Sequence, residues 1–172
     1  DVTEPGTNNL NAGAWTSITI SPSGGATRTI SGTVAGNPLI TLNGADNVTF
    51  NGLNTGGNAL TITNLSTAST SGTSTIKFIT DATNNTITNC TVLGSSTTAV
   101  GTNGGTFWFA AAAASVGNDN NTISNCNIGP NGSSLPTKHF YGNGSTGSTA
   151  LGNSGISITG NNIFDYFGAA TT

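Results

Sequence analysis

Two cysteines occupy the same slot of a nine-residue motif that occurs twice in the chain. The segments NNTITNCTV (84–92) and NNTISNCNI (120–128) place Cys90 and Cys126 36 positions apart. In equivalent turns of a repeating structure their backbones would lie about 4.8 Å apart, within the Cα range of a disulfide, although parallel side chains give poor Cβ geometry. We expect two unbonded, buried thiols, with a disulfide as the main alternative. No metal site is expected, because zinc needs more ligands and the single histidine, His139, is distant in sequence.

The carboxylates are the next candidates for chemistry, since clustered acids can perform acid–base catalysis. Asp46, Asp81 and Asp119 precede a recurring aliphatic position by 2, 6 and 4 residues, which places all three in turns. Aspartate in a turn usually caps it by accepting hydrogen bonds. We therefore predict turn chemistry, with weak calcium binding and catalysis as alternatives, and we expect no catalytic residue and no cofactor. Basic partners are equally scarce, because the chain holds only Arg28, Lys77 and Lys138.

A binding face is a further hypothesis. Three phenylalanines recur at steps of 31 residues, namely Phe78, Phe109 and Phe140. If these rings point inward, alternation along a strand sends their neighbours outward. The predicted outward column consists of Lys77, Trp108, His139 and Tyr141. Aromatic rings beside polar groups can stack on the apolar side of a sugar. The structural alternative is that Trp108 packs under the long loops at 94–105 or 118–121.

Composition limits the partners. The net charge is -3 and only 5% of residues are charged, so no basic patch exists for nucleic acid. No apolar run approaches the roughly 18 residues of a membrane span, so membrane insertion is not expected. Two cysteines, no methionine and 25 glycines are more typical of a secreted product than of a cytosolic enzyme. We expect an extracellular or cell-surface location.

The repeat predicts the elements that position these residues. Two apolar residues five positions apart recur with starts 39, 36 and 35 residues apart, at Val48 to Leu53, Ile87 to Val92, Ile123 to Ile128 and Ile158 to Ile163. Short strands interrupted by Asn and Gly cannot bury their faces alone, so successive coils must stack into a solenoid. Helical patterns are nearly absent, and the one helical alternative is the alanine run 110–115.

Asparagine suits the corners of such a solenoid. It tolerates the left-handed conformation, and its amide can bond the same amide in the next coil. The predicted corner column is Asn51, Cys90, Cys126 and Asn161, flanked by Asn89 and Asn125. Threonine ladders also raise the idea of ice binding, but we do not expect a regular Thr-x-Thr array on the outward strand positions.

These motifs resemble the right-handed parallel β-helix repeats of pectate-lyase-like folds, and more narrowly those of large secreted surface proteins of Bacteroidetes-type bacteria. The resemblance covers about 39–167 and implies an all-β solenoid of about five coils, as an excised segment of a longer array. We expect one continuous domain, with 1–37 as an N-terminal coil or cap and 38–172 as the coils. In the first segment, Ile18, Ile20, Ile30 and Val34 are expected to face inward.

The resemblance also implies a function. We expect a non-catalytic stalk, adhesin or filament segment that associates end to end or stacks on neighbouring repeats of its own chain, with cell-surface or polysaccharide glycans as further partners. The alternative is a carbohydrate-binding or polysaccharide-degrading β-helix domain, acting as a lyase or a glycoside hydrolase.

Overall fold

Three parallel β-sheets wrap around one interior in the computed structural model, which describes residues 1–24, 26–53, 60–111 and 115–167. Sheet A contains β1 (Val2–Glu4), β4 (Arg28–Gly32), β7 (Leu60–Asn64), β10 (Cys90–Gly94), β13 (Asn127–Gly129) and β16 (Asn162–Ile163). Sheet B contains β2 (Asn8–Asn11), β5 (Pro38–Asn43), β8 (Ser74–Ile79), β11 (Gly105–Phe109) and β14 (Phe140–Gly142). Sheet C contains β3 (Ile18–Ile20), β6 (Val48–Asn51), β9 (Thr86–Thr88), β12 (Thr122–Ser124) and β15 (Ser157–Thr159).

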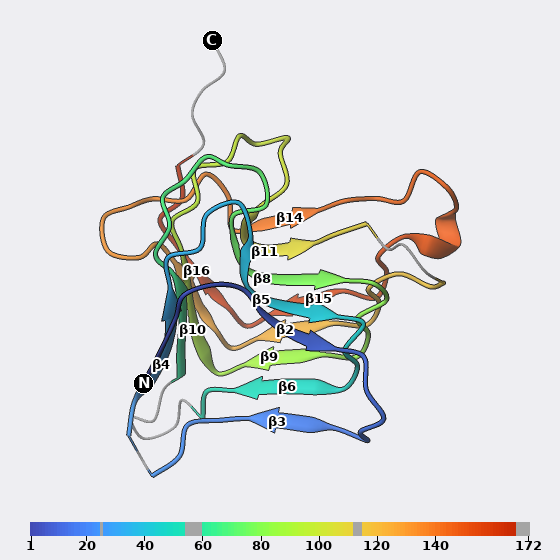
Figure 1. Ribbon diagram of the computed structural model, residues 1–172, viewed down its shortest axis with the longest axis horizontal. Coiled ribbons are helices and arrows are strands. Elements are labelled where there is room, and N and C mark those ends of the chain that lie inside the picture. Colours follow the sequence, from blue (N-terminus) through green and yellow to red (C-terminus); the bar gives the residue numbers. More distant parts are fainter. Residues whose placement is uncertain (25, 54–59, 112–114, 168–172) are drawn as a thin grey trace.

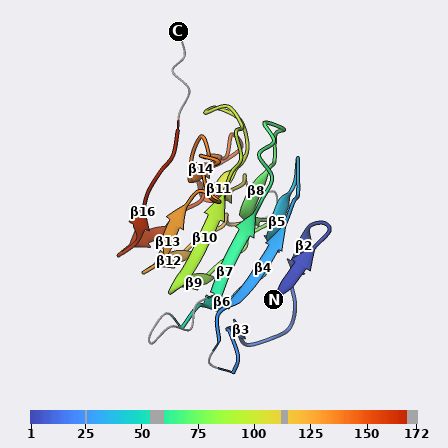
Figure 2. The same cartoon turned by 90° about the vertical axis from the view of Figure 1, so that its left-hand side faces the viewer.

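The chain visits the three sheets in turn, so each strand pairs with the strand one coil away. Figure 1 shows the strands of sheets B and C stacked in this order, and Figure 2 shows β4, β7, β10 and β13 of sheet A side by side. The described residues contain no α-helix, only a short 3₁₀ turn, η1 (Thr149–Leu151). The prediction of an all-β parallel solenoid of about five coils is confirmed.

Columns of apolar side chains in register fill the interior. The column of sheet C runs through Ile20, Phe50, Ile87, Ile123 and Ile158. The column of sheet A runs through Val2, Ile30, Ile62, Val92, Ile128 and Ile163. The middle members are fully buried, whereas the last ones, Ile158 and Ile163, are 40% and 44% exposed. Burial of this apolar surface is the main force that holds the coils together.

The first predicted copy of the repeat was wrong in register. Phe50, and not Val48, lies in the column of Ile87. Ile62, and not Leu53, lies opposite Val92, while Leu53 is 37% exposed. Leu53 fails because the corner between β6 and β7 holds extra residues. Val48 fails because Phe50, two residues further along the same strand, takes the column position.

Sheet B shows a similar shift. Phe109 stacks on Phe78 as predicted, with ring centroids 4.7 Å apart. Phe140, however, pairs with Phe107 at a centroid distance of 5.2 Å, and not with Phe109. The coil that ends at β14 is therefore two residues longer than the 31-residue step assumed. This shift moves every neighbour of Phe140 by two positions.

Left-handed residues form the two corners of sheet C. Asn84 and Asn120 precede β9 and β12, and Asn89 and Asn125 follow them, with φ between 53° and 56°. Asparagine tolerates this conformation better than other residues with a Cβ. Glycine replaces it in the last coil, at Gly155 and Gly160 (φ 62° and 64°). The strands β9, β12 and β15 are therefore each cut to three residues.

The predicted corner column is correct only in its later members. The backbone N of Cys126 donates to Asn161 Oδ1 at 2.8 Å, so these two slots are adjacent. Asn51, however, pairs with Thr88 and not with Cys90, because it belongs to the shifted first copy. The left-handed positions are the flanking residues Asn89 and Asn125.

The asparagine ladder is confirmed, but its buried core lies elsewhere than predicted. Asn121 Oδ1 accepts from Asn85 N at 2.9 Å and from Asn85 Nδ2 at 3.0 Å. Asn121 Nδ2 donates to Ala82 O and Asn118 O, and both ladder asparagines are fully buried. The ladder therefore satisfies backbone groups at a buried corner that has no strand partner.

The N-terminal segment continues the same architecture. Strands β1 to β4 extend the sheets, Val34 is buried, and Ile18, Ile20 and Ile30 pack against the core as expected. Trp15 Nε1 donates to Asp46 O at 2.8 Å, which ties the first coil to the second. The helical alternative at 110–115 falls largely on 112–114, outside the described residues.

Candidate functional site

The predicted outward column of sheet B exists in part. Lys77, Trp108 and Tyr141 lie in register on β8, β11 and β14. Lys77 Nζ lies 4.0 Å from the Trp108 ring centroid, a cation–π contact, and burial lowers the pKa of Lys77. Trp108 Nε1 donates to Asn143 Oδ1 at 2.6 Å, and the whole residue is only 8% exposed. The indole is therefore packed and does not offer the open ring that a sugar platform requires.

His139 is absent from this column. It precedes β14, and the two-residue shift of Phe140 places it beside Thr106 and not beside Trp108. It is only 4% exposed, and its ring contacts Phe164 and Tyr166 of the last coil. Its Nε2 lies 2.9 Å from Phe164 O, which can only accept, so Nε2 carries the proton. Nδ1 then accepts from Thr106 Oγ1 at 3.0 Å. Burial lowers the pKa of His139, with the bond to Phe164 opposing it, which favours the neutral ring.

Lys138 ties down a loop that lies beside this column. Its Nζ donates to Ala99 O at 2.6 Å and to Thr102 O at 2.8 Å, and it lies 4.8 Å from the Tyr141 ring centroid. The Tyr141 hydroxyl donates to Gly101 O at 2.9 Å. These contacts fix the loop 98–102 against β14. These hydrogen bonds occupy the Lys138 ammonium and the Tyr141 hydroxyl, which leaves fewer donors for a ligand.

The three candidate carboxylates connect successive coils, as the turn prediction requires. Asp46 Oδ1 accepts from Thr83 N at 2.7 Å, and Asp119 Oδ1 accepts from Ser154 N at 2.7 Å. Asp81 accepts four hydrogen bonds, and the one from the backbone N–H of Gly117 is 3.0 Å long. Desolvation raises the pKa of Asp81, but the hydrogen bonds from 115–117 outweigh it and the net pKa is lowered.

The described residues hold no group of three His, Cys, Asp or Glu side chains placed to bind a metal ion. Cys90 and Cys126 are unbonded and buried, as expected. The hydrogen bond with Cys126, together with burial, raises the pKa of the Cys90 thiol, so this sulfur is held neutral. A neutral, buried thiol such as that of Cys90 is a poor nucleophile and a poor metal ligand. The same hydrogen bond lowers the pKa of the Cys126 thiol, against the effect of burial.

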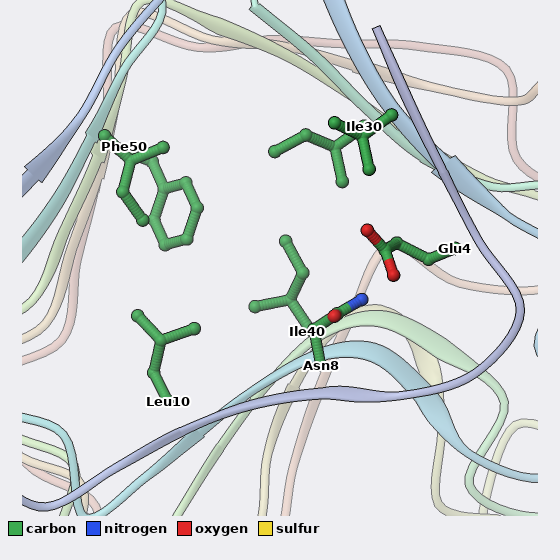
Figure 3. Close-up of a pocket in the computed structure, with 8 residues that line it drawn as sticks. Glu4, Asn8, Leu10, Ile30, Ile40 and Phe50 are labelled. Carbon is green, nitrogen blue, oxygen red and sulfur yellow. The ribbon is translucent and has the colours of Figure 1, made fainter.

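Two cavities lie at the ends of the interior. At the N-terminal end, a cavity of about 200 Å³ opens between β1, β2 and β3. Figure 3 shows Leu10, Ile30, Ile40 and Phe50 around it, with the polar ends of Glu4 and Asn8 on one side. A second hollow of about 420 Å³ at the other end is lined by Lys138, His139, Phe140 and Tyr166, among others. Both are ends of the apolar columns and are lined mainly by apolar surface.

Sheet C carries a feature that the sequence prediction missed. Its outward side chains form two columns of small polar residues, one before and one after each buried member of the interior column. The first column is Thr19, Thr49, Thr86, Thr122 and Ser157. The second is Asn51, Thr88, Ser124 and Thr159. The expectation of no regular Thr-x-Thr array holds, because only β9 carries that motif, at Thr86 and Thr88, while β6, β12 and β15 combine threonine with asparagine or serine. The mixed polar array itself was not expected, although its signal was present as TIT, TIS and SIT around the recurring isoleucine.

Comparison with protein-family models, with curated proteins and with solved structures finds no match to this chain. Within the part of the chain that the structure describes, no helix is long and apolar enough to cross a bilayer. The contacts described above are therefore the basis for any functional proposal.

Proposed function

We propose that this chain is a non-catalytic structural segment of a secreted or surface-attached protein, acting as a stalk, adhesin or filament building block. The observation that carries the proposal is the unbroken in-register pairing of all three sheets. Each coil is hydrogen-bonded to the next along the axis, so stability grows with the number of neighbouring coils. Such an object resists bending and extension without needing charged surface contacts.

The use of the chemically capable residues supports this role. The carboxylates of Asp46, Asp81 and Asp119 bond backbone or hydroxyl donors in the following coil. Trp108 is packed between neighbours on its own sheet, which makes a carbohydrate-binding or polysaccharide-degrading role the weaker proposal. An extracellular location agrees with the low content of charged residues. The resemblance to surface proteins of Bacteroidetes-type bacteria supports an adhesin or stalk.

The apolar columns also support stacking on further coils. At the N-terminal end the interior is lined by Leu10, Ile20 and Ile40, and at the other end Ile158 and Ile163 are partly exposed. Neighbouring repeats of the same chain, or a second copy, would cover this surface. Sedimentation at rising concentration tests the second copy: association supports it, and a persistent monomer leaves only neighbouring repeats.

Force spectroscopy tests the structural role. The chain is pulled by its two ends, and we expect one cooperative, high-force unfolding event because the coils unfold as stacked units. Gradual unravelling at low force would contradict the proposal. In parallel, polysaccharides are screened for release of reducing ends or unsaturated uronides. Turnover that is lost in Asp81→Asn and Asp119→Asn would overturn the non-catalytic assignment.

A further inference from the structure

The outer face of sheet C is a two-dimensional array of hydroxyl and amide groups. Its two columns repeat from strand to strand at about 4.7–4.9 Å, the spacing of paired strands. Along each strand the two outward positions are two residues apart, which is about 6.6–6.8 Å. Figure 1 shows β9, β6 and β3 of this sheet side by side. The face therefore presents a pair of hydroxyl or amide side chains on each of β6, β9, β12 and β15, at a regular interval from strand to strand.

Three features hold the array rigid. The left-handed corners at Asn84, Asn89 and their equivalents give β9, β12 and β15 the same length of three residues. The residue between the two columns, such as Ile87 or Ile123, is fully buried and fixes which way its neighbours point. Threonine is also stiff at χ1, because two heavy atoms branch from its Cβ. The hydroxyls are consequently held in place before any ligand arrives.

Many of these groups are available to a partner. Thr86, Thr122 and Ser157 are half-buried, and Thr19 and Thr159 are exposed. Among the described residues, none forms a hydrogen bond with the side-chain hydroxyl of Thr49, Thr86 or Thr122. Ser124 Oγ donates to Thr88 Oγ1 at 3.0 Å, which leaves further acceptor positions on both oxygens.

The chemistry of the face narrows the class of partner. Neither column contains a charged or aromatic side chain, so the face offers no ion pair to a phosphate or uronate and no ring to a sugar. Each threonine instead presents one hydroxyl and one methyl group. The partner must be uncharged, must hydrogen-bond, and must repeat in two dimensions.

Ice has these properties. In a tetrahedral network with O···O distances of about 2.75 Å, next-nearest oxygens are about 4.5 Å apart and the layered repeat is about 7.3 Å. The corresponding repeats of the face are within roughly 10% of these values. We infer that the outer face of sheet C binds the surface of ice. Its hydroxyls replace water oxygens of the lattice, while its methyl groups occupy the spaces between them.

Sheet A serves as an internal comparison. One outward column there is also polar, with Thr29, Thr61, Thr91, Asn127 and Asn162 in register. The other column is interrupted by Leu93 and Gly129, and its Thr63 is only 5% exposed. Sheet A therefore has polar groups but no two-dimensional array, so a substitution there controls for general surface effects.

The test uses the chain of 172 residues, measured by thermal hysteresis and by its partition into slowly grown ice. We expect a hysteresis gap and enrichment in the ice fraction. Thr88→Tyr and Thr122→Tyr each place a bulky ring in the array and should remove both signals. Thr91→Tyr on sheet A should keep them, and circular dichroism and melting confirm that each variant is folded.

Two results would overturn the inference. One is that the unaltered chain shows no hysteresis and is excluded from ice, and the other is that Thr91→Tyr reduces binding as much as Thr122→Tyr. Microcrystalline cellulose and chitin are included as competing regular surfaces. Retention on these polysaccharides without any effect on ice assigns the face to a crystalline glycan and rejects ice. Neither the pulling experiment nor the turnover screen depends on these outcomes.

Discussion

The buried amide of Asn121 bonds both the backbone N and the side-chain Nδ2 of Asn85 in the preceding coil, at 2.9 and 3.0 Å. The same side chain donates to Ala82 O at 2.8 Å and to Asn118 O at 3.0 Å. All the hydrogen-bonding capacity needed at this corner thus comes from one residue type repeated in successive coils. These hydrogen bonds give the asparagine ladder a structural role, which the high asparagine content of the chain alone would not imply.

Asn121→Ala should therefore be strongly destabilising. It leaves buried groups of Asn85, Ala82 and Asn118 without this partner, and each unsatisfied group costs about 1–3 kcal/mol. We expect a loss of several kcal/mol in the free energy of unfolding, measured by urea denaturation. Asn9→Ala is the matched control, because Asn9 is exposed on β2. Equal stability of Asn121→Ala and the control would contradict the ladder's role.

Low pH should weaken the hydrogen bonds that join the Asp81 carboxylate to residues 115–117 of the next coil. Its pKa is lowered in the folded state, so its stabilising effect is complete above the unfolded value of 3.8 and is lost as the pH falls through the folded pKa. Asp81→Asn should flatten the fall in melting temperature over this acidic range. Asp165→Asn, which removes a carboxylate at an exposed site, is the matched control. Parallel slopes for the Asp81 variant and the unaltered chain would refute the prediction.

His139 should titrate at a lower pH than a free histidine. Its folded pKa is lowered from 6.5, so the unfolded chain binds the proton more readily and stability decreases as the pH falls below 6.5. NMR can follow this directly, because the chain contains one histidine. We expect a titration midpoint below 6.5 and a neutral ring protonated at Nε2. A midpoint at or above 6.5 would show that the ring is exposed.

Trp108→Ala should lower the stability of the fold whether or not a ligand binds. Removing a buried tryptophan costs about 3–5 kcal/mol, because transfer free energy is lost and a cavity is left. Phe167→Ala is the control, since Phe167 is 62% exposed. The measurement is thermal unfolding with a glycan-binding assay on the same samples. A stable Trp108→Ala protein that loses glycan binding would instead favour the carbohydrate-binding alternative.

Much of the fold could be predicted from the motifs around Ile87, Ile123 and Ile158. Their coils have nearly equal lengths, so spacing in sequence matches register in space. The prediction failed at Val48, Leu53 and His139, where a corner is lengthened and later residues shift by two positions. The hydroxyl array was missed for a related reason, because Asn51 was assigned to the corner column.

The amino-acid sequence by itself determined the class of structure. Alternation of apolar and polar residues and left-handed asparagines such as Asn89 and Asn125 act over a few residues, so their effect can be read locally. Only the tertiary structure decided which residues of successive coils lie opposite one another. Whether Phe140 lies on Phe107, whether His139 is buried and whether sheet C presents an ordered hydroxyl face all depend on register. Register is set by packing between coils, where loops of different length are accommodated without changing the buried columns.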